Sequence, residues 1–576
     1  TGSDYYKSEN GDLYSKDGKT LILVAPNKNL GAFTLPANVE EIGAGAFAGN
    51  SSLTSFTASG SALKSIGNAA FSDCVNLTSV ILPDSCAYIG DNAFFGANKL
   101  ASFTGNSVTH FGEYSFANTA LTSVTVPAGA EVGEAAFAAV GDFKSVLKTV
   151  NVGAGATLGE GAFMECGALK TVIMPNEGGV TIVGMTFYNC AKLTTIDMSK
   201  IGSDGENCIV GYASFYGCSR LTTADLANVT AIGDYCFAGC SSLATVSLPK
   251  VLYIGADAFT STNYSVNNAP VITELDMPEV QYIDTGAFDG LKSLTTVSMP
   301  EIVKIADGGA YTMGSNQSYI FSGAFSNCEN LTSVEMGTLA RLPDFVFYNC
   351  GKLASIDLSK VKYIGIMALG GVPITEANLT ECLKIGTQAF SLYNQNNEKL
   401  VSVNAPELAV LNDGAFSSCV NLGSVNMPKL QSMGVSAFGG CTSLTVFALS
   451  ANLKNVDYRA FYGAAALTGF TYNGQSDAET DNFVLDKGVL YTVLPNGGYQ
   501  LSVYPAGKTD SEYSVIENTR RIEFGAAEGN KWLQKVILPS SLKNIGNMAF
   551  YECSALKEVV FNSYYAPQLE GTVSIE

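Results

Sequence analysis

The six-residue pattern I-G-x-x-A-F recurs along this chain and constrains its fold more than any other feature. It reads IGAGAF at 42–47, IGNAAF at 66–71, IGDNAF at 89–94 and IGNMAF at 545–550. Its phenylalanine falls at 47, 71, 94, 116, 137, 163, 187, 215, 237, 259, 288, 325, 347, 390, 416, 438, 461 and 550. Several gaps are about 22 to 24 residues, a period typical of solenoids, in which a single repeat cannot bury its apolar side. We therefore expect a repeat solenoid rather than a series of globular domains.

Residues 77–94, LTSVILPDSCAYIGDNAF, predict the structure of one coil. L-x-x-V-x-L-P indicates a short strand with apolar side chains at alternate positions, ended by Pro83. The I-G segment predicts a second short strand or extended turn on the opposite side. Its glycine indicates either a bend with positive φ or a close backbone approach. A-F-x-x-C predicts a single helical turn whose phenylalanine fills the interior.

Stacking of such coils predicts a mainly β, right-handed, curved leucine-rich-repeat solenoid with a parallel sheet on its concave face. Leu369 takes the phenylalanine position in one coil, and residues 522–538 form a degenerate one. With these two the chain has about twenty coils.

Two segments break the period and resemble each other. Residues 11–26 and 487–505 each carry two apolar strands around a turn, Asp17-Gly18 in the first and Asn496-Gly497 in the second, which predicts β-hairpins. The first is expected to cap the exposed edge of the N-terminal coil. We therefore divide the chain into an N-terminal cap (1–34), the solenoid (35–473), a hairpin interruption (474–519) and C-terminal repeats (520–576).

The cysteines follow the repeat. Of 14 cysteines, ten lie three residues after the phenylalanine position: Cys74, Cys166, Cys190, Cys218, Cys240, Cys328, Cys350, Cys419, Cys441 and Cys553. Alanine, glycine, threonine or asparagine fill this position elsewhere, so we expect small buried thiols that act as compact hydrophobic groups. Neighbouring coils lie within disulfide reach, which leaves occasional bridges open. C-x-x-C pairs are absent, so no zinc site is expected.

The net charge of −20 argues against nucleic-acid and anionic-membrane partners, because like charges repel. No run of about 18 apolar residues predicts a transmembrane helix. The chain begins at Thr1 without a recognisable signal, so either a targeting segment has been removed or the chain is an excised piece.

The full repeat, L-x-x-V-x-L-P-x-x-V-x-x-I-G-x-x-A-F-x-x-C-x-x-L, resembles the BspA-like, or Treponema-type, class of leucine-rich repeats over nearly the whole chain. It departs from the commoner leucine-rich repeat because proline or a small residue replaces the asparagine ladder. The resemblance implies export from a bacterial cell, a secreted or outer-surface location with a lipid anchor as one route, and adhesion to host proteins or other cells. Partners vary within the family, so the ligand is an analogy.

Sequence motifs for catalysis are missing. The single histidine, His110, precedes the apolar position Phe111 and is interpreted as a solvated surface residue. No Gly-x-Ser-x-Gly elbow or phosphate-binding loop occurs. We expect no enzyme activity, no cofactor and no metal site.

One strand position forms an acidic column that changes to amides along the chain. It holds Asp197, Asp225, Asp276, Glu335 and Asp357, and then Asn378, Asn404 and Asn426. Strand alternation places these side chains on the solvent side of the sheet. They either keep the sheet soluble or form a docking surface for a basic protein patch or a divalent cation, since carboxylates facing one another across strands repel.

The position before the I-G step holds Tyr88, Tyr253, Tyr282 and Tyr363. Exposed tyrosines are favoured at recognition sites, but they also pack as a surface ladder. We expect a non-enzymatic, monomeric, secreted or cell-surface binding protein that adheres to a protein through its concave face. A carbohydrate-binding role through the tyrosines and a structural spacer role are the alternatives.

Overall fold

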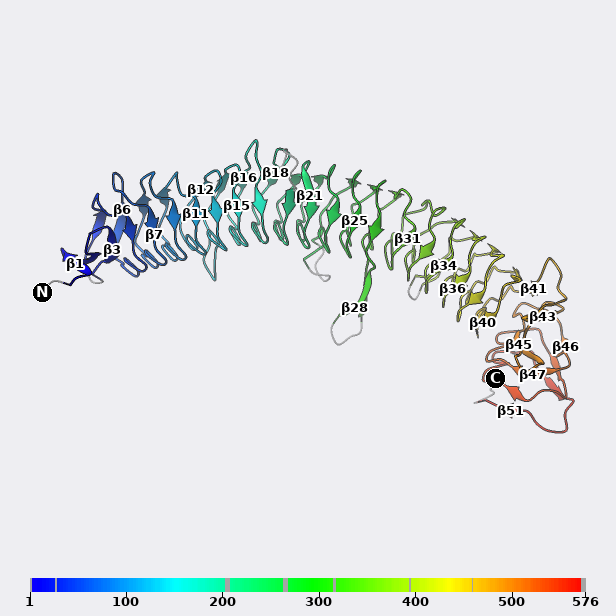
Figure 1. The fold of residues 1–576 in the computed structure, drawn as a ribbon. Helices are drawn as coiled ribbons and strands as arrows, with labels where there is room; N and C mark the ends of the chain where they lie inside the picture. The colour runs from blue at the N-terminus through cyan, green and yellow to red at the C-terminus, as the bar shows by residue number, and fades with distance from the viewer. Residues whose placement is uncertain are drawn as a thin grey trace. The chain divides into compact units, whose positions relative to one another are not determined.

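The chain winds into a β-solenoid of about 23 turns with parallel sheets. The computed structural model describes residues 3–25, 28–201, 208–262, 268–313, 318–392, 395–457 and 459–570, and these contain strands and turns but no helix. Contacts divide the chain into two compact units, Thr1–Glu301 and Ile302–Glu576. Within each unit the turns stack in chain order (Figure 1).

In the first unit the I-G strands form one continuous parallel sheet. Its strands are β3 (Thr20–Leu23), β5 (Glu41–Ile42), β7 (Ser65–Ile66), β9 (Tyr88–Ile89), β11 (His110–Phe111), β13 (Glu131–Val132), β15 (Thr157–Leu158), β17 (Thr181–Ile182), β19 (Cys208–Val210), β21 (Val229–Ile232), β23 (Tyr253–Ile254) and β25 (Tyr282–Ile283). Each is paired with the corresponding strand of the next turn. The predicted second strand of the coil is therefore confirmed.

The L-x-x-V strands of the first unit form separate parallel sheets. The first contains β4 (Gly31–Thr34), β6 (Leu53–Thr57), β8 (Ser79–Ile81) and β10 (Ser102–Thr104). The next contains β12 (Ser123–Val126), β14 (Thr149–Val152), β16 (Thr171–Ile173), β18 (Thr195–Asp197), β20 (Thr223–Asp225) and β22 (Thr245–Ser247). β24 (Glu274–Asp276) and β26 (Thr296–Ser298) pair in a third. This side of the coil is thus interrupted where the other side is continuous.

The predicted N-terminal hairpin is present. β2 (Asp12–Ser15) pairs antiparallel with β3 across a turn in which Gly18 has φ +78°, and β1 (Tyr6–Glu9) adds a further antiparallel strand. The other edge of β3 pairs in parallel with β5. The hairpin therefore covers the first edge of the I-G sheet.

A column of phenylalanine rings fills the first unit. Successive rings from Phe47 to Phe288 stack with centroids 4.7 to 5.6 Å apart. Such offset stacking adds to the free energy that burial of each ring contributes. The repeated phenylalanine is therefore the structural core of the coil.

The A-F-x-x-C segment is not the helical turn that the sequence predicts. Two positions, two residues before and two residues after the phenylalanine, take positive φ, as at Ala69 (54°) and Asp73 (55°) around Phe71. A right-handed helix cannot contain such residues. The segment forms successive turns closed by three-residue bonds, such as Ala70 N to Gly67 O at 3.2 Å.

The I-G glycine serves a close backbone approach. A Cβ on Gly67 would lie 2.8 Å from the backbone nitrogen of Ala44 in the preceding turn. Positive φ is needed two residues later instead. Of the two roles that the sequence left open, close approach therefore applies at this position.

All 14 cysteines are buried free thiols. Most of the thiols three residues after the repeat phenylalanine also have a polar contact, which the sequence did not indicate. Cys74 Sγ donates to the carbonyl of Phe47 at 3.1 Å, and Cys190 Sγ donates to that of Phe163 at 3.3 Å. Each thiol thus satisfies a buried carbonyl of the preceding turn, and burial raises the pKa of Cys74 to about 12.

The second unit repeats the same coil. Its I-G sheet contains β31 (Arg341–Leu342), β32 (Tyr363–Ile364), β34 (Lys384–Ile385), β36 (Val410–Leu411), β38 (Ser432–Met433) and β40 (Asn455–Val456). β27 (Lys304–Ile305) is a further I-G strand, and the L-x-x-V strands are β30 (Ser333–Glu335), β33 (Glu376–Asn378), β35 (Ser402–Asn404), β37 (Ser424–Asn426), β39 (Val446–Ala448) and β41 (Gly469–Thr471). β28 (Gly309–Met313) and β29 (Ser318–Ser322) form an antiparallel hairpin (Figure 1).

The second predicted hairpin is also present. β44 (Val489–Val493) pairs antiparallel with β45 (Tyr499–Val503), and β42 (Ala478–Glu479) and β43 (Phe483–Asp486) precede them. β45 continues in parallel to β47 (Thr519–Ile522), β49 (Asn544–Ile545) and β51 (Gln568–Leu569), and β46 (Glu512–Ser514), β48 (Lys535–Leu538) and β50 (Glu558–Phe561) form the facing sheet. The domain boundaries proposed at residues 34, 473 and 519 stay predictions.

Candidate binding surfaces

The acidic column lies on exposed strand positions, and part of it has a local structural role. In the first unit Asp197 on β18 is the register partner of Asp225 on β20, while Asp276 on β24 faces Ser298. Asp197 Oδ1 accepts bonds from the Ser199 backbone nitrogen at 3.0 Å and from its hydroxyl at 2.6 Å. The hydroxyl and then the amide hold the pKa of Asp197 below its usual value. These carboxylates therefore close the turn that follows the strand.

The same role recurs along the column. Asp225 Oδ1 accepts from the nitrogen of Ala227 at 3.2 Å, and Asp357 Oδ1 accepts from that of Ser359 at 2.9 Å. Asp357 lies outside a regular strand, whereas Glu335 is on β30. An aspartate that precedes a turn by two residues is a local sequence signal for this role, which its place in the acidic column alone does not indicate. The predicted concave placement of this column stays a prediction.

The amide part of the column forms a ladder in the second unit. Asn378, Asn404 and Asn426 are register partners on β33, β35 and β37. Asn426 Nδ2 donates to Asn404 Oδ1 at 2.8 Å. An amide can both donate and accept across strands, which a carboxylate cannot, so the change from Asp to Asn favours contact between turns.

The four predicted tyrosines share one repeat position but do not form one stripe. Tyr88 stacks on His110 with centroids 4.6 Å apart, and Tyr253 stacks on Tyr282 at 5.2 Å. Tyr363 lies between Arg341 and Lys384 in strand register. His110 is thus half-buried in a ring stack, with Nδ1 3.5 Å from Glu131, rather than simply solvated.

The structure brings further tyrosines and carboxylates around Tyr253. We call this set the Tyr–Asp patch; it comprises Tyr212, Tyr235, Tyr253, Tyr282, Asp234, Asp257 and Asp284. Tyr253 donates from its hydroxyl to Asp284 Oδ2 at 3.2 Å. The Tyr212 and Tyr235 rings meet edge to face at 6.1 Å. The prediction from the residue before the I-G step did not include Tyr212 and Tyr235, because these tyrosines occupy other positions of the repeat.

Negative charge accumulates in the Tyr–Asp patch. Burial raises the pKa of Asp257, a bond from Tyr235 lowers it, and the Asp234 and Asp284 carboxylates raise it further. Asp257 Oδ1 is buried without a hydrogen-bond partner among the described atoms. Burial, followed by the neighbouring carboxylates, raises the pKa of Tyr235 and of Tyr253 to about 12. The patch therefore offers neutral phenols beside carboxylates that repel one another.

The tyrosines of this patch are open to a partner. Tyr212 is 52% exposed, Tyr235 39% and Tyr253 36%. Each ring thus combines apolar area with a hydroxyl at the surface.

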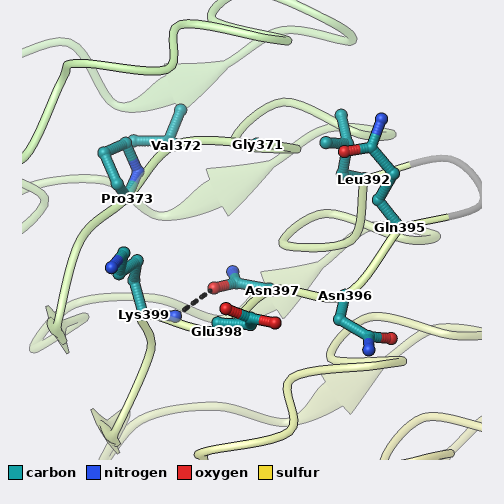
Figure 2. A pocket seen from close by; sticks show the side chains of 9 residues that line it. All are labelled: Gly371, Val372, Pro373, Leu392, Gln395, Asn396, Asn397, Glu398 and Lys399. Atoms are coloured by element: carbon teal, nitrogen blue, oxygen red, sulfur yellow. Dashed lines mark hydrogen bonds between the residues drawn. The ribbon is translucent and has the colours of Figure 1, made fainter.

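A polar hollow of about 590 Å³ opens in the second unit (Figure 2). One wall of the hollow is apolar and contains Val372, Pro373 and Leu392. The remaining lining is polar and contains Gln395, Asn396, Glu398 and Lys399. The Asn397 amide is used to hold the loop, since Oδ1 accepts from Lys399 N at 3.0 Å and Nδ2 donates to Phe390 O at 3.1 Å.

The described ranges contain no group of three His, Cys, Asp or Glu side chains placed to hold a metal ion. No helix in the same ranges is long and apolar enough to cross a membrane.

Comparison with known proteins identifies the repeat. The model of the "BspA type Leucine rich repeat region" family matches residues 26–144, 156–271, 262–396, 383–483 and 511–567. No curated protein matches. A leucine-rich repeat protein of Bacteroides ovatus is 21% identical, with 82% of this chain and 99% of that chain covered and a TM-score of 0.39. A leucine rich cell surface protein of Faecalibacterium prausnitzii is 18% identical, with 82% and 96% covered and a TM-score of 0.25.

Proposed function

Because the chain belongs to the BspA-type leucine-rich repeat family, we propose that it is a non-enzymatic binding protein of the cell surface or the secreted fraction. Its ligand in this proposal is another protein with a basic surface. The location rests on what the family implies, and the ligand class rests on the chemistry of the Tyr–Asp patch.

The Tyr–Asp patch is the observation that carries the proposal. Lysine and arginine side chains bind both the faces of aromatic rings and carboxylates. A cation placed beside the patch would offset the repulsion that Asp234 and Asp284 exert on Asp257. Exposed tyrosines would supply rigid contact area around that charge.

The first-unit part of the acidic strand column is the alternative docking surface. Asp197 and Asp225 face one another, so a basic partner would relieve their repulsion as well. However, each already accepts bonds from its own turn. The column therefore supports the same class of partner less strongly than the patch does.

Carbohydrate binding receives less support from the tyrosines. A sugar stacks on an uncovered ring face, whereas Tyr253 and Tyr282 lie nearly parallel, at 3°, and cover each other. The same holds for Tyr88 and His110, at 2°. A glycan array is nevertheless the direct comparison for this alternative.

The test uses the full chain and two triple variants. The patch variant carries Asp234→Asn, Asp257→Asn and Asp284→Asn, and the control carries Asp197→Asn, Asp225→Asn and Asp276→Asn. Both lose three charges, and asparagine keeps the oxygen that accepts the turn bonds. Binding to a panel of extracellular-matrix proteins and to a lysine-rich peptide is measured by surface plasmon resonance.

We expect the patch variant to lose about tenfold in affinity, the equivalent of about 1.4 kcal/mol, and the control to lose less than about twofold. A larger loss in the control would place binding on the strand column instead. Equal losses would mean that only net charge matters. Glycan binding without protein binding would reject the proposal.

A further inference from the structure

The sheet of L-x-x-V strands in the first unit breaks between β10 and β12. β10 is the last strand of one sheet and β12 the first of the next, and no backbone hydrogen bond between described residues joins them. On the other sides of the coil, backbone hydrogen bonds join the same two turns as usual. Gly133 N donates to Phe111 O at 2.7 Å, and Phe116 N donates to Ala136 O at 2.7 Å. The break is thus confined to one side of the coil.

The sequence contains the cause of this break. Six positions separate Phe71 from Leu77, the first residue of the strand motif, but only five separate Phe116 from Leu121. A connection that is one residue shorter cannot bring β12 into the usual register beside β10. The Thr119 hydroxyl instead donates to the Phe116 carbonyl at 2.9 Å.

A second departure empties the space beside the break. Gly105 stands where the strand motif has Leu82 one turn earlier and Val126 one turn later. Phe103, at the repeat position of Val80, packs edge-on against Phe116 with centroids 4.7 Å apart. A Cβ on Gly105 would lie 2.7 Å from the Phe103 ring, so this ring occupies part of the space of the missing side chain.

The result is a cavity of about 190 Å³ at the break. We call it the β10–β12 slot; its lining is apolar at Leu121, Val124 and Phe137 and polar at Asn106, Ser123 and Thr125. An apolar cavity of about 150 Å³ holds a benzene-sized ring. The slot is therefore large enough for one leucine or phenylalanine side chain.

The core side chains are slightly more exposed to solvent at the slot than in the preceding turns. Leu121 is 5% exposed, Val124 7% and Phe137 6%. Their counterparts two or three turns earlier, Leu77, Val80 and Phe71, are each 0% exposed. Filling the slot would remove this apolar area from water, which is favourable.

The rim of the slot is made of unpaired strand edges. Thr104 O accepts from Leu82 N at 2.8 Å on one side, and Thr122 O accepts from Lys148 N at 2.9 Å on the other. Peptide groups of a parallel strand face alternate sides. Those of Phe103, Ser123 and Thr125 therefore face the break, where they can bond an extended peptide.

We propose that the β10–β12 slot binds an extended segment of a protein partner, which inserts one apolar side chain while its backbone bonds the free strand edges. This is the recognition mode of strand addition combined with a side-chain pocket. The inference deepens the proposed function because it describes a second contact with a protein ligand. It shares no residue with the Tyr–Asp patch, so the two can fail separately.

The probes are blocked pentapeptides, acetyl-Ser-Thr-Xaa-Thr-Ser-amide, with Leu, Phe, Ala or Asp at the central position, and benzene alone. Binding to the full chain is followed by the methyl NMR shifts of Leu121 and Val124, with Leu77 and Val80 as internal references. The variant Gly105→Leu restores the leucine of the repeat; because its Cβ would lie 2.7 Å from the Phe103 ring, that ring must move as the slot is filled. Gly351→Leu is the control, because nothing lies within 4 Å of a Cβ at Gly351.

We expect the Leu and Phe peptides to bind at least about tenfold more tightly than the Ala and Asp peptides. Gly105→Leu should abolish the shifts, and Gly351→Leu should preserve them. Hydrogen exchange of residues 101–106 and 122–127 in the unaltered chain should slow when the Leu peptide binds, a readout that needs no variant. Equal binding of the Leu and Asp peptides, unchanged binding by folded Gly105→Leu, or shifts with benzene but with none of the peptides would each overturn the proposal.

Discussion

The hydroxyl of Tyr253 donates a hydrogen bond to Oδ2 of Asp284 in the next turn, at 3.2 Å. Burial raises the pKa of the Asp257 carboxyl, while Tyr235, which lies beside it, lowers that pKa. The two carboxylates differ in their remaining contacts, because Asp284 Oδ1 accepts from Thr285 N at 2.7 Å, whereas Asp257 Oδ1 has no described partner. Asp257 is thus the member of the Tyr–Asp patch that gains most from an added cation or from loss of its charge.

Asp257→Asn should raise the thermal midpoint at neutral pH. The folded pKa of Asp257 lies above the ordinary value of 3.8, so its favourable contribution is complete below that value and is lost as pH rises through the folded pKa. Asparagine removes this loss. The gain should therefore be present at pH 7 and absent at pH 3, as measured by calorimetry.

Asp197→Asn provides the comparison of opposite sign. Bonds from Ser199 hold the pKa of Asp197 below 3.8, so its contribution is complete above that value and is lost as pH falls through the folded pKa. Asn at this position should lower the midpoint at pH 7. The same direction of change in both variants at pH 7 would contradict the assigned electrostatics.

Phe163→Ala should destabilise the first unit by about 3–5 kcal/mol, because it removes a fully buried ring from the core. Its ring stacks on both Phe137 and Phe187, at 5.3 and 5.6 Å. Phe163→Leu should cost less than about 1.5 kcal/mol, since Leu369 fills this position in another coil. Urea unfolding measures both, and a loss at Phe163→Leu as large as that at Phe163→Ala would show that the ring stack, rather than apolar volume, sets core stability.

Gly67→Ala and Gly45→Ala should differ sharply. At Gly67 the added methyl group would meet the Ala44 nitrogen at 2.8 Å, which the backbone must move to avoid. Gly45 has φ +66° with nothing within 4 Å of its Cβ, and Ala69 takes this repeat position at φ 54°. We expect a loss of about 1 kcal/mol at Gly45 and a larger one at Gly67. Thermal unfolding of the two variants makes the comparison.

The cysteines should resist alkylation in the folded protein. Burial raises the pKa of Cys74 to about 12 and that of Cys86 to about 11, so the reactive thiolate is scarce at pH 8. Iodoacetamide should modify the 14 thiols only after denaturant is added. Cys208, the least deeply buried, should react first. Rapid labelling of Cys74 in the native state, detected by mass spectrometry, would contradict this account.

Some features of the candidate surfaces were readable from the sequence and others were not. Tyr253 and Tyr282 share a repeat position, so their contact follows from the register. Tyr212 and Asp257 occupy other positions of the repeat, and only the folding of the turn brings them near Tyr253. The prediction of a helical turn was wrong because residues such as Ala69 adopt positive φ, which an alanine side chain does not favour.

The sequence by itself determined the coil: its length, its buried phenylalanine, its small thiol and the hairpins that break the period. These follow from local chain length and from which side chains must leave water, and both are repeated in every coil. The tertiary structure decided where the repeat fails to close. The five-residue step from Phe116 to Leu121 is visible in the sequence, but the β10–β12 slot exists because strand pairing depends on two turns at once. No single coil contains the information that sets the distance between neighbouring strands.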